Sequence, residues 1–137
     1  MGASGPHFSA TELACHHCGV NECTQSLVDA LEAFRAIVGK PVVVSSAYRC
    51  QQHNAEAGGA DRSEHVEGLA ADIRVKGMPA AQMEALARKI PAIRGIGRND
   101  HQEYIHVDVR PTLTLARWCY RPDGKWCGYY PPLAEAA

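Results

Sequence analysis

The 137-residue sequence has no long hydrophobic segment and no strong excess of charge of either sign. No apolar run approaches the roughly 18 residues that a membrane-spanning helix needs, so we expect no transmembrane segment. The formal net charge of -1 argues against a broad nucleic-acid-binding surface. Internal repeats, low-complexity tracts and interdomain linkers are also missing. We therefore expect one domain over residues 1–137, with an ordered core over about 8–130.

The N-terminal segment also lacks the usual targeting patterns. "MGASGPHFSATEL" has no charged start followed by an apolar middle, so it is not typical of a Sec signal peptide. Pro6 stands where N-myristoylation requires Ser or Thr. We expect synthesis in the cytoplasm without a Sec signal.

Hydrophobic periodicity predicts an α+β fold: helices first, and then a small, mostly antiparallel sheet with inserted helices. Apolar residues at three- and four-residue steps predict an amphipathic helix over 24–38, and β-branched residues predict a buried strand over 41–45. Other strands are predicted over 69–75, at "IRGIG" and at "YIHVDVR". A brief helix is expected in "YRCQQHNAEAGGA", stopped by Gly58 and Gly59, and another from Pro79 to about Ile90.

Six cysteines are more than most cytosolic proteins carry. They allow three disulfides, and reduced thiols or a structural metal site on the C-x2-C pair are the alternatives. The "CYRPDGKWC" segment is typical of a hairpin, which makes a cross-strand disulfide geometrically feasible between its two cysteines. The cysteines are Cys15, Cys18, Cys23, Cys50, Cys119 and Cys127.

Two polar residues interrupt strands that are otherwise apolar. Asp72 lies between Ala71 and Ile73 in a predicted core strand, where an unpaired carboxylate costs several kcal/mol. His106 has a similar setting in "YIHVDVR", and His65 lies on the loop that leads into the strand of Asp72. Two imidazoles and one carboxylate form a typical catalytic zinc site, with its fourth position left to water. A buried His–Asp hydrogen bond without metal is the alternative.

"SEHVEGLAAD" resembles the S-x-H-x-x-G-x-A-x-D signature of the zinc D-Ala-D-Ala carboxypeptidase family, whose metal arrangement hedgehog-type and lysostaphin-type domains share. "SSAYRC", "HNAEAGGADRSEH" and "YIHVDVR" resemble further blocks of that family, and "FSATELAC" resembles the start of its small phage and bacterial members. The resemblance implies a hedgehog/D-Ala-D-Ala carboxypeptidase-like fold with flanking helices. It also implies a Zn²⁺ ion held by His65, Asp72 and His106.

The resemblance implies a general base at Glu103, three positions before the last histidine ligand, which would move a proton from water to the leaving amine. Residues three apart in a regular strand face opposite ways, so Glu103 must lie before the strand or at a bend. Asp108 is the competing base, or else a partner that orients a ligand histidine. Arg49 would bind a substrate carboxylate or the oxyanion, unless it only begins a solvated helix.

The remaining candidates have weaker signals. Ser63 would hydrogen-bond near the site or cap a local turn, and His101 would help to bind substrate, although a surface position suits His101 and His53 better. The aromatic residues of "RWCYRPDGKWCGYYPP" would complete a small core or line a groove for cell-wall sugars.

These observations predict a zinc metallopeptidase that acts on peptidoglycan stem peptides or cross-bridges at the bacterial cell wall or periplasm. It would be a monomeric carboxypeptidase or endopeptidase, as in a phage endolysin, with no nucleic-acid or membrane partner. The alternatives are a non-catalytic zinc-containing binding module, a metal-free structural protein such as a phage tail component, and a dipeptidase for free D-Ala-D-Ala.

Overall fold

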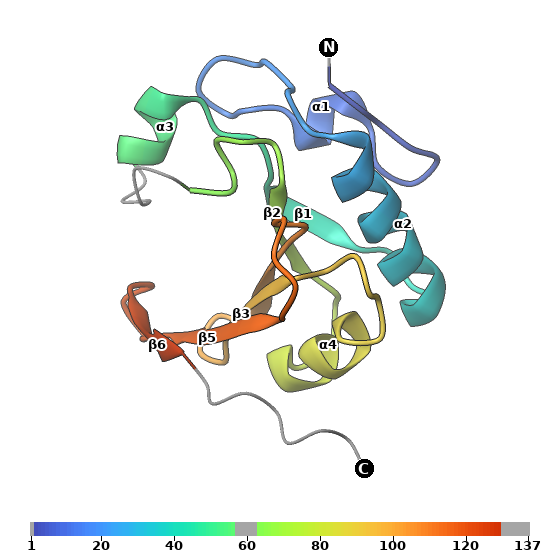
Figure 1. The fold of residues 1–137 in the computed structure, drawn as a ribbon, viewed down its shortest axis with the longest axis vertical. Helices are drawn as coiled ribbons and strands as arrows, with labels where there is room; N and C mark the ends of the chain where they lie inside the picture. The colour runs from blue at the N-terminus through green and yellow to red at the C-terminus, as the bar shows by residue number, and fades with distance from the viewer. Residues whose placement is uncertain (1, 57–62, 130–137) are drawn as a thin grey trace.

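The computed structural model of the chain describes residues 2–56 and 63–129. Within these ranges the chain begins with helices, continues with strands and helices intermixed, and ends with a run of strands from β3 to β6 (Figure 1). The elements are α1 (Ala10–Leu13), α2 (Gln25–Val38), β1 (Val43–Ser46), α3 (Gln51–Glu56), β2 (Ala70–Arg74), α4 (Ala80–Ala87), β3 (Gly95–Asn99), β4 (Tyr104–Asp108), β5 (Ala116–Tyr120) and β6 (Trp126–Tyr129).

The N-terminal helices begin and end at the residues that their sequences indicate. Ser9 and Glu12 form a capping box at the start of α1, each side chain bonding to the other's backbone N–H. Thr24 caps α2 through its side-chain oxygen, and Gly39 ends that helix in a left-handed conformation with φ of 70°. The α3 helix confirms the brief helix predicted there, while Gly58 and Gly59 lie outside the described residues.

The six strands form one sheet in the order β1-β2-β4-β3-β5-β6. Our expectation of a mostly antiparallel sheet is wrong, because β3 pairs with β5 in parallel and the sheet is mixed. After β4 ends at Asp108, the chain crosses β3 and continues as β5, which lies on the side of β3 away from β4. Sequence patterns do not encode which strands become neighbours across such a connection.

The predicted strand over 41–45 exists but is not buried. β1 lies at the edge of the sheet and the Val43 side chain is 51% exposed. β-branched residues favour both edge and central strands, so their presence did not distinguish the two positions.

The hydrophobic core lies between one face of the sheet and the helices α2 and α4, which cover that face (Figure 1). Alternate residues of β2 and β4 point into it, because successive side chains in a strand face opposite ways. Fully buried side chains on this side include Leu27, Leu31, Phe34, Ile73, Met83, Ile96, Ile105 and Val107.

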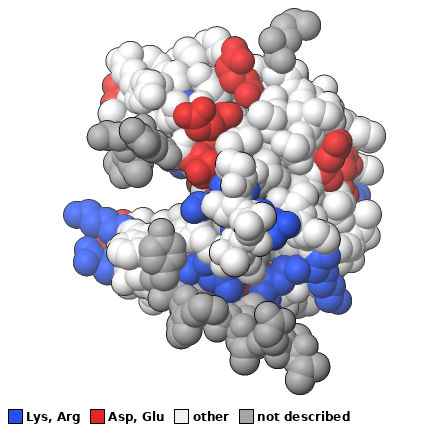
Figure 2. Space-filling view, viewed as in Figure 1, with Lys and Arg blue, Asp and Glu red and all other residues white. Residues whose placement is uncertain are grey.

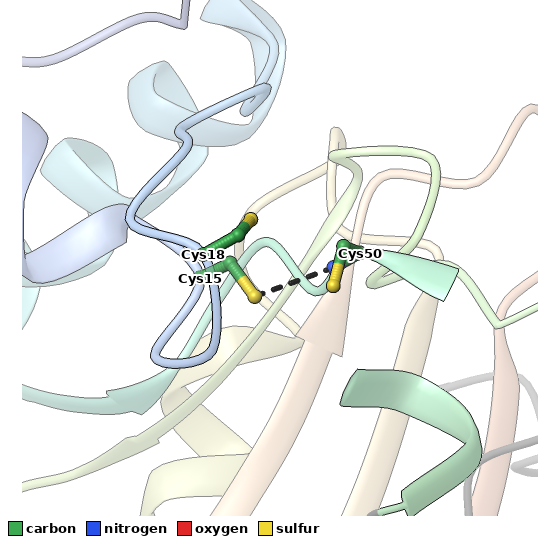
Figure 3. Close-up of side chains that lie close together, drawn as sticks. All are labelled: Cys15, Cys18 and Cys50. Atoms are coloured by element: carbon green, nitrogen blue, oxygen red, sulfur yellow. Dashed lines mark hydrogen bonds between the residues drawn. The ribbon is translucent and has the colours of Figure 1, made fainter. Parts of the chain in front are cut away.

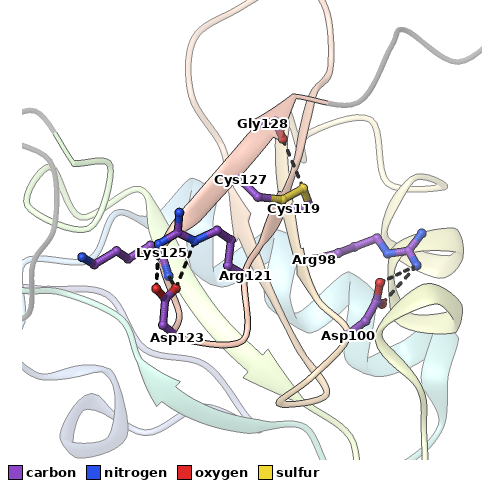
Figure 4. The surroundings of a disulfide bond; sticks show 8 residues. All are labelled: Arg98, Asp100, Cys119, Arg121, Asp123, Lys125, Cys127 and Gly128. Atoms are coloured by element: carbon purple, nitrogen blue, oxygen red, sulfur yellow. Dashed lines mark hydrogen bonds and ion pairs between the residues drawn. A yellow bond between two sulfur atoms is a disulfide. The ribbon is translucent and has the colours of Figure 1, made fainter.

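The predicted hairpin is formed by β5 and β6, and it carries the disulfide that we considered feasible between Cys119 and Cys127, whose Cα atoms are 5.5 Å apart (Figure 4). Gly124, with φ of 85°, closes the turn through a 2.8 Å bond from its N–H to the carbonyl oxygen of Arg121. The side chain of Arg121 also pairs with Asp123 within the turn. Among the described residues, no helix has the length and apolar character needed to cross a bilayer.

Candidate metal centre

The residues of the candidate site form a row across the sheet. Asp72 in β2 lies opposite His106 in β4, which lies opposite Gly97 in β3, and Gly97 lies opposite Trp118 in β5. Side chains of directly opposed residues point to the same face of a sheet. This row therefore lies on the face away from α2 and α4, where Figure 2 shows the molecular surface hollowed above the β5–β6 hairpin.

His65 reaches this row from the turn that precedes β2. Its Nε2 lies 3.3 Å from Oδ1 of Asp72, and Nδ1 of His106 lies 3.3 Å from the same oxygen. The two imidazole rings meet edge to face with centroids 5.1 Å apart. One donor atom from each of the three residues lies within 4.8 Å of the others, as a common metal ion would require.

The hydrogen bonds of the two rings fix which nitrogens remain available to a metal. Nδ1 of His65 donates to the carbonyl oxygen of Ala47 at 2.7 Å, and Nε2 of His106 donates to Oδ2 of Asp108 at 2.7 Å. A neutral imidazole with one nitrogen protonated has its lone pair on the other. Nε2 of His65 and Nδ1 of His106 can therefore both present lone pairs toward the Asp72 carboxylate, an arrangement that a cation stabilises.

The charges in this group reinforce one another. Burial would raise the pKa of Asp72, but the neighbouring His65 and His106 hold that pKa well below its usual range. Burial would lower the pKa of His106, but its hydrogen bonds to Asp108 and Asp72 outweigh this effect and raise the pKa to about 9. Without metal, the His106 ring is thus protonated at neutral pH and bridges two carboxylates.

Arg49 lies beside the group. Its guanidinium donates to Oδ2 of Asp72 at 3.2 Å and to the Ser46 hydroxyl at 3.1 Å. A further bond of 3.4 Å reaches Oδ1 of Asn54 in α3. Asp72 thus uses one oxygen for the two histidines and the other for Arg49, so the arginine both fixes the carboxylate and adds positive charge next to the centre.

Glu103 lies in the turn before β4. This is one of the positions that we expected for it, because a residue three before His106 within a regular strand would face the opposite way. It is the one non-glycine residue of residues 2–56 and 63–129 with a positive φ, 55°, a conformation that costs about 1–3 kcal/mol and is frequent at functional sites. In this structure its carboxylate is not turned to the histidines. It accepts a 3.2 Å bond from the N–H of Ala80 at the start of α4.

The other predicted residues have local roles. Asp108 is fully buried and receives bonds from Arg110 as well as from His106, so it orients a candidate ligand rather than facing substrate. The Ser63 hydroxyl accepts from the N–H of His65 at 3.2 Å, which stabilises the turn. His101 is exposed in the turn between β3 and β4, and its backbone N–H bonds to the side chain of Asn99.

Trp118 also belongs to the site, although it was not among the predicted site residues. Its ring lies 5.0 Å from that of His106 and is covered by the guanidinium of Arg110, also at 5.0 Å. A side-chain carbon at Gly97 would overlap the Trp118 ring, and one at Gly95 would overlap the Asp108 carboxylate. The alternating glycines of "IRGIG" were the available signal, because glycine within a strand marks a close approach.

Comparison with protein families agrees with this geometry. A family model described as Peptidase M15 matches residues 6–108, a segment that contains every candidate ligand. The chain belongs to this family and is a metallopeptidase by that membership. No curated protein matches the chain at a significant level.

Proposed function

We propose that this protein is a zinc-dependent peptidase that hydrolyses peptide bonds of bacterial peptidoglycan. The observation that carries the proposal is the convergence of Nε2 of His65 and Nδ1 of His106 on one oxygen of the Asp72 carboxylate. Two imidazoles and one carboxylate match the donor set of catalytic zinc. The other ring nitrogen of each histidine is already bonded, which is the usual support for metal-ligating imidazoles.

Zinc held by these three residues would supply a Lewis acid that polarises a scissile carbonyl and activates water. The chain's own residues perform the remaining work. Arg49, fixed against Asp72, offers a permanent charge to a substrate carboxylate or to the developing oxyanion. Asp108 and the Ala47 carbonyl hold the two imidazoles in the tautomers that metal binding needs.

Glu103 is the proposed general base, taking a proton from the attacking water and passing it to the leaving amine. To do so, its side chain leaves the N–H of Ala80 and rotates toward the sheet face of His106. Glu103 lies in the turn before β4 with a left-handed backbone conformation, so the regular alternation of the strand does not fix the direction of its side chain.

The substrate assignment derives from the family and from the face that surrounds the centre. Aromatic rings line this face beyond Trp118, with Tyr104 and Tyr120 centred 5.9 Å apart. Such rings pack against the sugar and alkyl parts of cell-wall fragments. We propose that the protein acts at the bacterial cell wall or periplasm, either as a carboxypeptidase on terminal D-Ala-D-Ala or as an endopeptidase within the stem or cross-bridge.

Digestion of purified peptidoglycan, followed by mass spectrometry of the released fragments, tests this function and identifies the bond. New free amines that disappear with a chelator and return with zinc are the expected result. Intact peptidoglycan after incubation with the fully zinc-loaded protein would contradict it.

One observation favours a second candidate, a zinc-containing binding module. The carboxylate of Glu103 is bonded to the start of α4 rather than to the candidate centre, as in a domain that needs no base. This alternative predicts sedimentation with insoluble peptidoglycan but no release of amines by the same zinc-loaded sample.

A further inference from the structure

A second group of metal-binding side chains lies away from the candidate peptidase centre. It joins the loop after α1 to the segment just before α3, as Figure 3 shows for the three cysteines involved. The sulfur atoms of Cys15, Cys18 and Cys50 all lie within 4.8 Å of one another. Nδ1 of His17 lies 3.6 Å from the sulfur of Cys50. Three thiols therefore converge, and the imidazole of His17 lies against the sulfur of one of them, Cys50.

The loop that carries Cys15 and Cys18 forms a tight turn. The N–H of Gly19 bonds to the carbonyl of Cys15 at 2.8 Å, and the N–H of Cys15 bonds to the carbonyl of Val20 at 2.8 Å. Gly19 takes φ of 76°, a left-handed conformation that suits glycine directly after Cys18. In this turn, the side chains of Cys15 and Cys18 point to the same side of the loop (Figure 3).

Backbone N–H groups point at the sulfur atoms. The N–H of His17 and the N–H of Cys50 each donate to the sulfur of Cys15 at 3.4 Å, the second bond being the dashed line of Figure 3. Donors of this kind stabilise negative charge on sulfur, and a thiolate is the form that binds a metal.

We propose that Cys15, His17, Cys18 and Cys50 bind a second, structural zinc ion. Three thiolates and one imidazole complete a closed tetrahedral set of the Cys₃His type. In a tetrahedral site with zinc–sulfur bonds of about 2.3 Å, the sulfur atoms lie about 3.8 Å from one another. The three sulfurs here lie within 4.8 Å of one another, a separation compatible with such a site. All four ligands come from the chain, so this site leaves no position for water and differs in kind from the peptidase centre.

The position of the site indicates what the ion stabilises. The loop between α1 and α2 contains no helix or strand, and Cys50 immediately follows Arg49. The backbone bond from the N–H of Tyr48 to the carbonyl of Leu13 already links the same two segments. A metal bound at this junction fixes the segment from which the Arg49 side chain reaches Asp72.

The test is cobalt substitution of the intact chain, prepared under reducing conditions, with absorption spectroscopy as the readout. Cobalt bound by thiolates gives a sulfur-to-metal charge-transfer band in the near ultraviolet, whereas a His-Asp-His centre contains no sulfur and cannot give one. We expect this band in the wild-type protein and in His106→Ala, together with two zinc ions per wild-type chain by elemental analysis. The outcome is therefore independent of peptidase activity.

Variants separate the ligands from the remaining buried thiol. Cys18→Ser and Cys50→Ser should each lose the charge-transfer band or weaken cobalt binding at least tenfold. Cys23→Ala is the matched control and should keep the band, since the Cys23 thiol donates instead to the carbonyl of Leu13. Absence of the band in reduced wild-type protein would overturn the proposal. So would a disulfide among Cys15, Cys18 and Cys50 that persists in protein purified with zinc present.

Discussion

Nε2 of His106 lies 2.7 Å from Oδ2 of Asp108, and the same carboxylate oxygen accepts a 2.8 Å bond from Arg110. The ring nitrogen that faces Asp72 is thereby assigned, because the opposite nitrogen is committed as a donor. Asp108 and Arg110 thus affect the candidate metal centre through the His106 ring, whose orientation they fix.

The Asp108→Asn variant tests this support. It keeps the shape of the side chain but removes the charge, so zinc affinity at the His-Asp-His centre should fall about tenfold or more. Competition with a chromophoric chelator measures the change. Asp123→Asn, which alters an exposed carboxylate paired with Arg121, serves as the control and should leave affinity unchanged. Equal affinities in both variants would remove Asp108 from the metal's support.

Glu103→Gln separates proton transfer from structure. The amide oxygen can still accept the bond from the N–H of Ala80, so stability and zinc content should match the wild type. Loss of the base should slow cleavage about 10²–10⁴-fold. Glu103→Ala should likewise abolish cleavage while zinc stays bound, whereas Asp72→Ala should lose the metal too. Substantial activity in Glu103→Gln would assign proton transfer to another group.

Metal binding should depend on pH through His106. Because the pKa of this ring in the metal-free protein is about 9, zinc binding at pH 7 must displace its proton. Affinity should therefore rise by about tenfold per pH unit and level off near pH 9. Calorimetry in buffers of different ionisation enthalpy, on a Cys18→Ser/Cys50→Ser background, counts the released protons. No proton release at pH 7 would contradict a protonated His106.

Gly97→Ala should destabilise the fold, because the added carbon overlaps the ring of Trp118. Overpacking of this kind costs about 1–3 kcal/mol in the free energy of unfolding. Trp118→Leu in the same chain should relieve the overlap, so the double variant should lose less than the sum of the two single losses. Urea denaturation of all four proteins completes the cycle, and simple additivity would show that the two residues do not interfere.

Glu84 provides a contrast on the opposite face of the sheet. This carboxylate is 2% exposed and pairs with Arg98 and Arg117 beneath α4. Glu84→Gln leaves two arginines without their shared counter-charge and should cost about 3–5 kcal/mol of stability. Zinc affinity should not change, and Glu67→Gln at an exposed position is the control. Metal loss in Glu84→Gln while the protein is still folded would contradict this separation of the two faces.

The candidate ligands could be predicted from sequence because each breaks a strong pattern. A buried carboxylate or imidazole between apolar strand residues requires a partner, and Asp72 and His106 both have that setting. His65 was grouped with them because it lies on the loop that leads into the strand of Asp72, and the family resemblance implied the same three ligands. Local turn chemistry made a disulfide between Cys119 and Cys127 feasible but did not select it among the possible cysteine pairings, and the structure contains it.

Features that depend on the neighbours of each strand could not be predicted in this way. Periodicity assigns a residue to a face but does not identify the strand beside it, so the parallel pairing of β3 with β5 and the edge position of β1 were missed. Trp118 was missed for the same reason, because it meets His106 only across Gly97.

The row from Asp72 through His106 to Gly97 has a consequence for how the protein matures. Asp72 and His106 are distant in sequence and face each other only after β2 and β4 have paired in the correct register. A shift by one residue would send one side chain to the helical side of the sheet. Zinc should therefore be captured late in folding, and metal occupancy would then report that newly made chains have aligned their strands correctly.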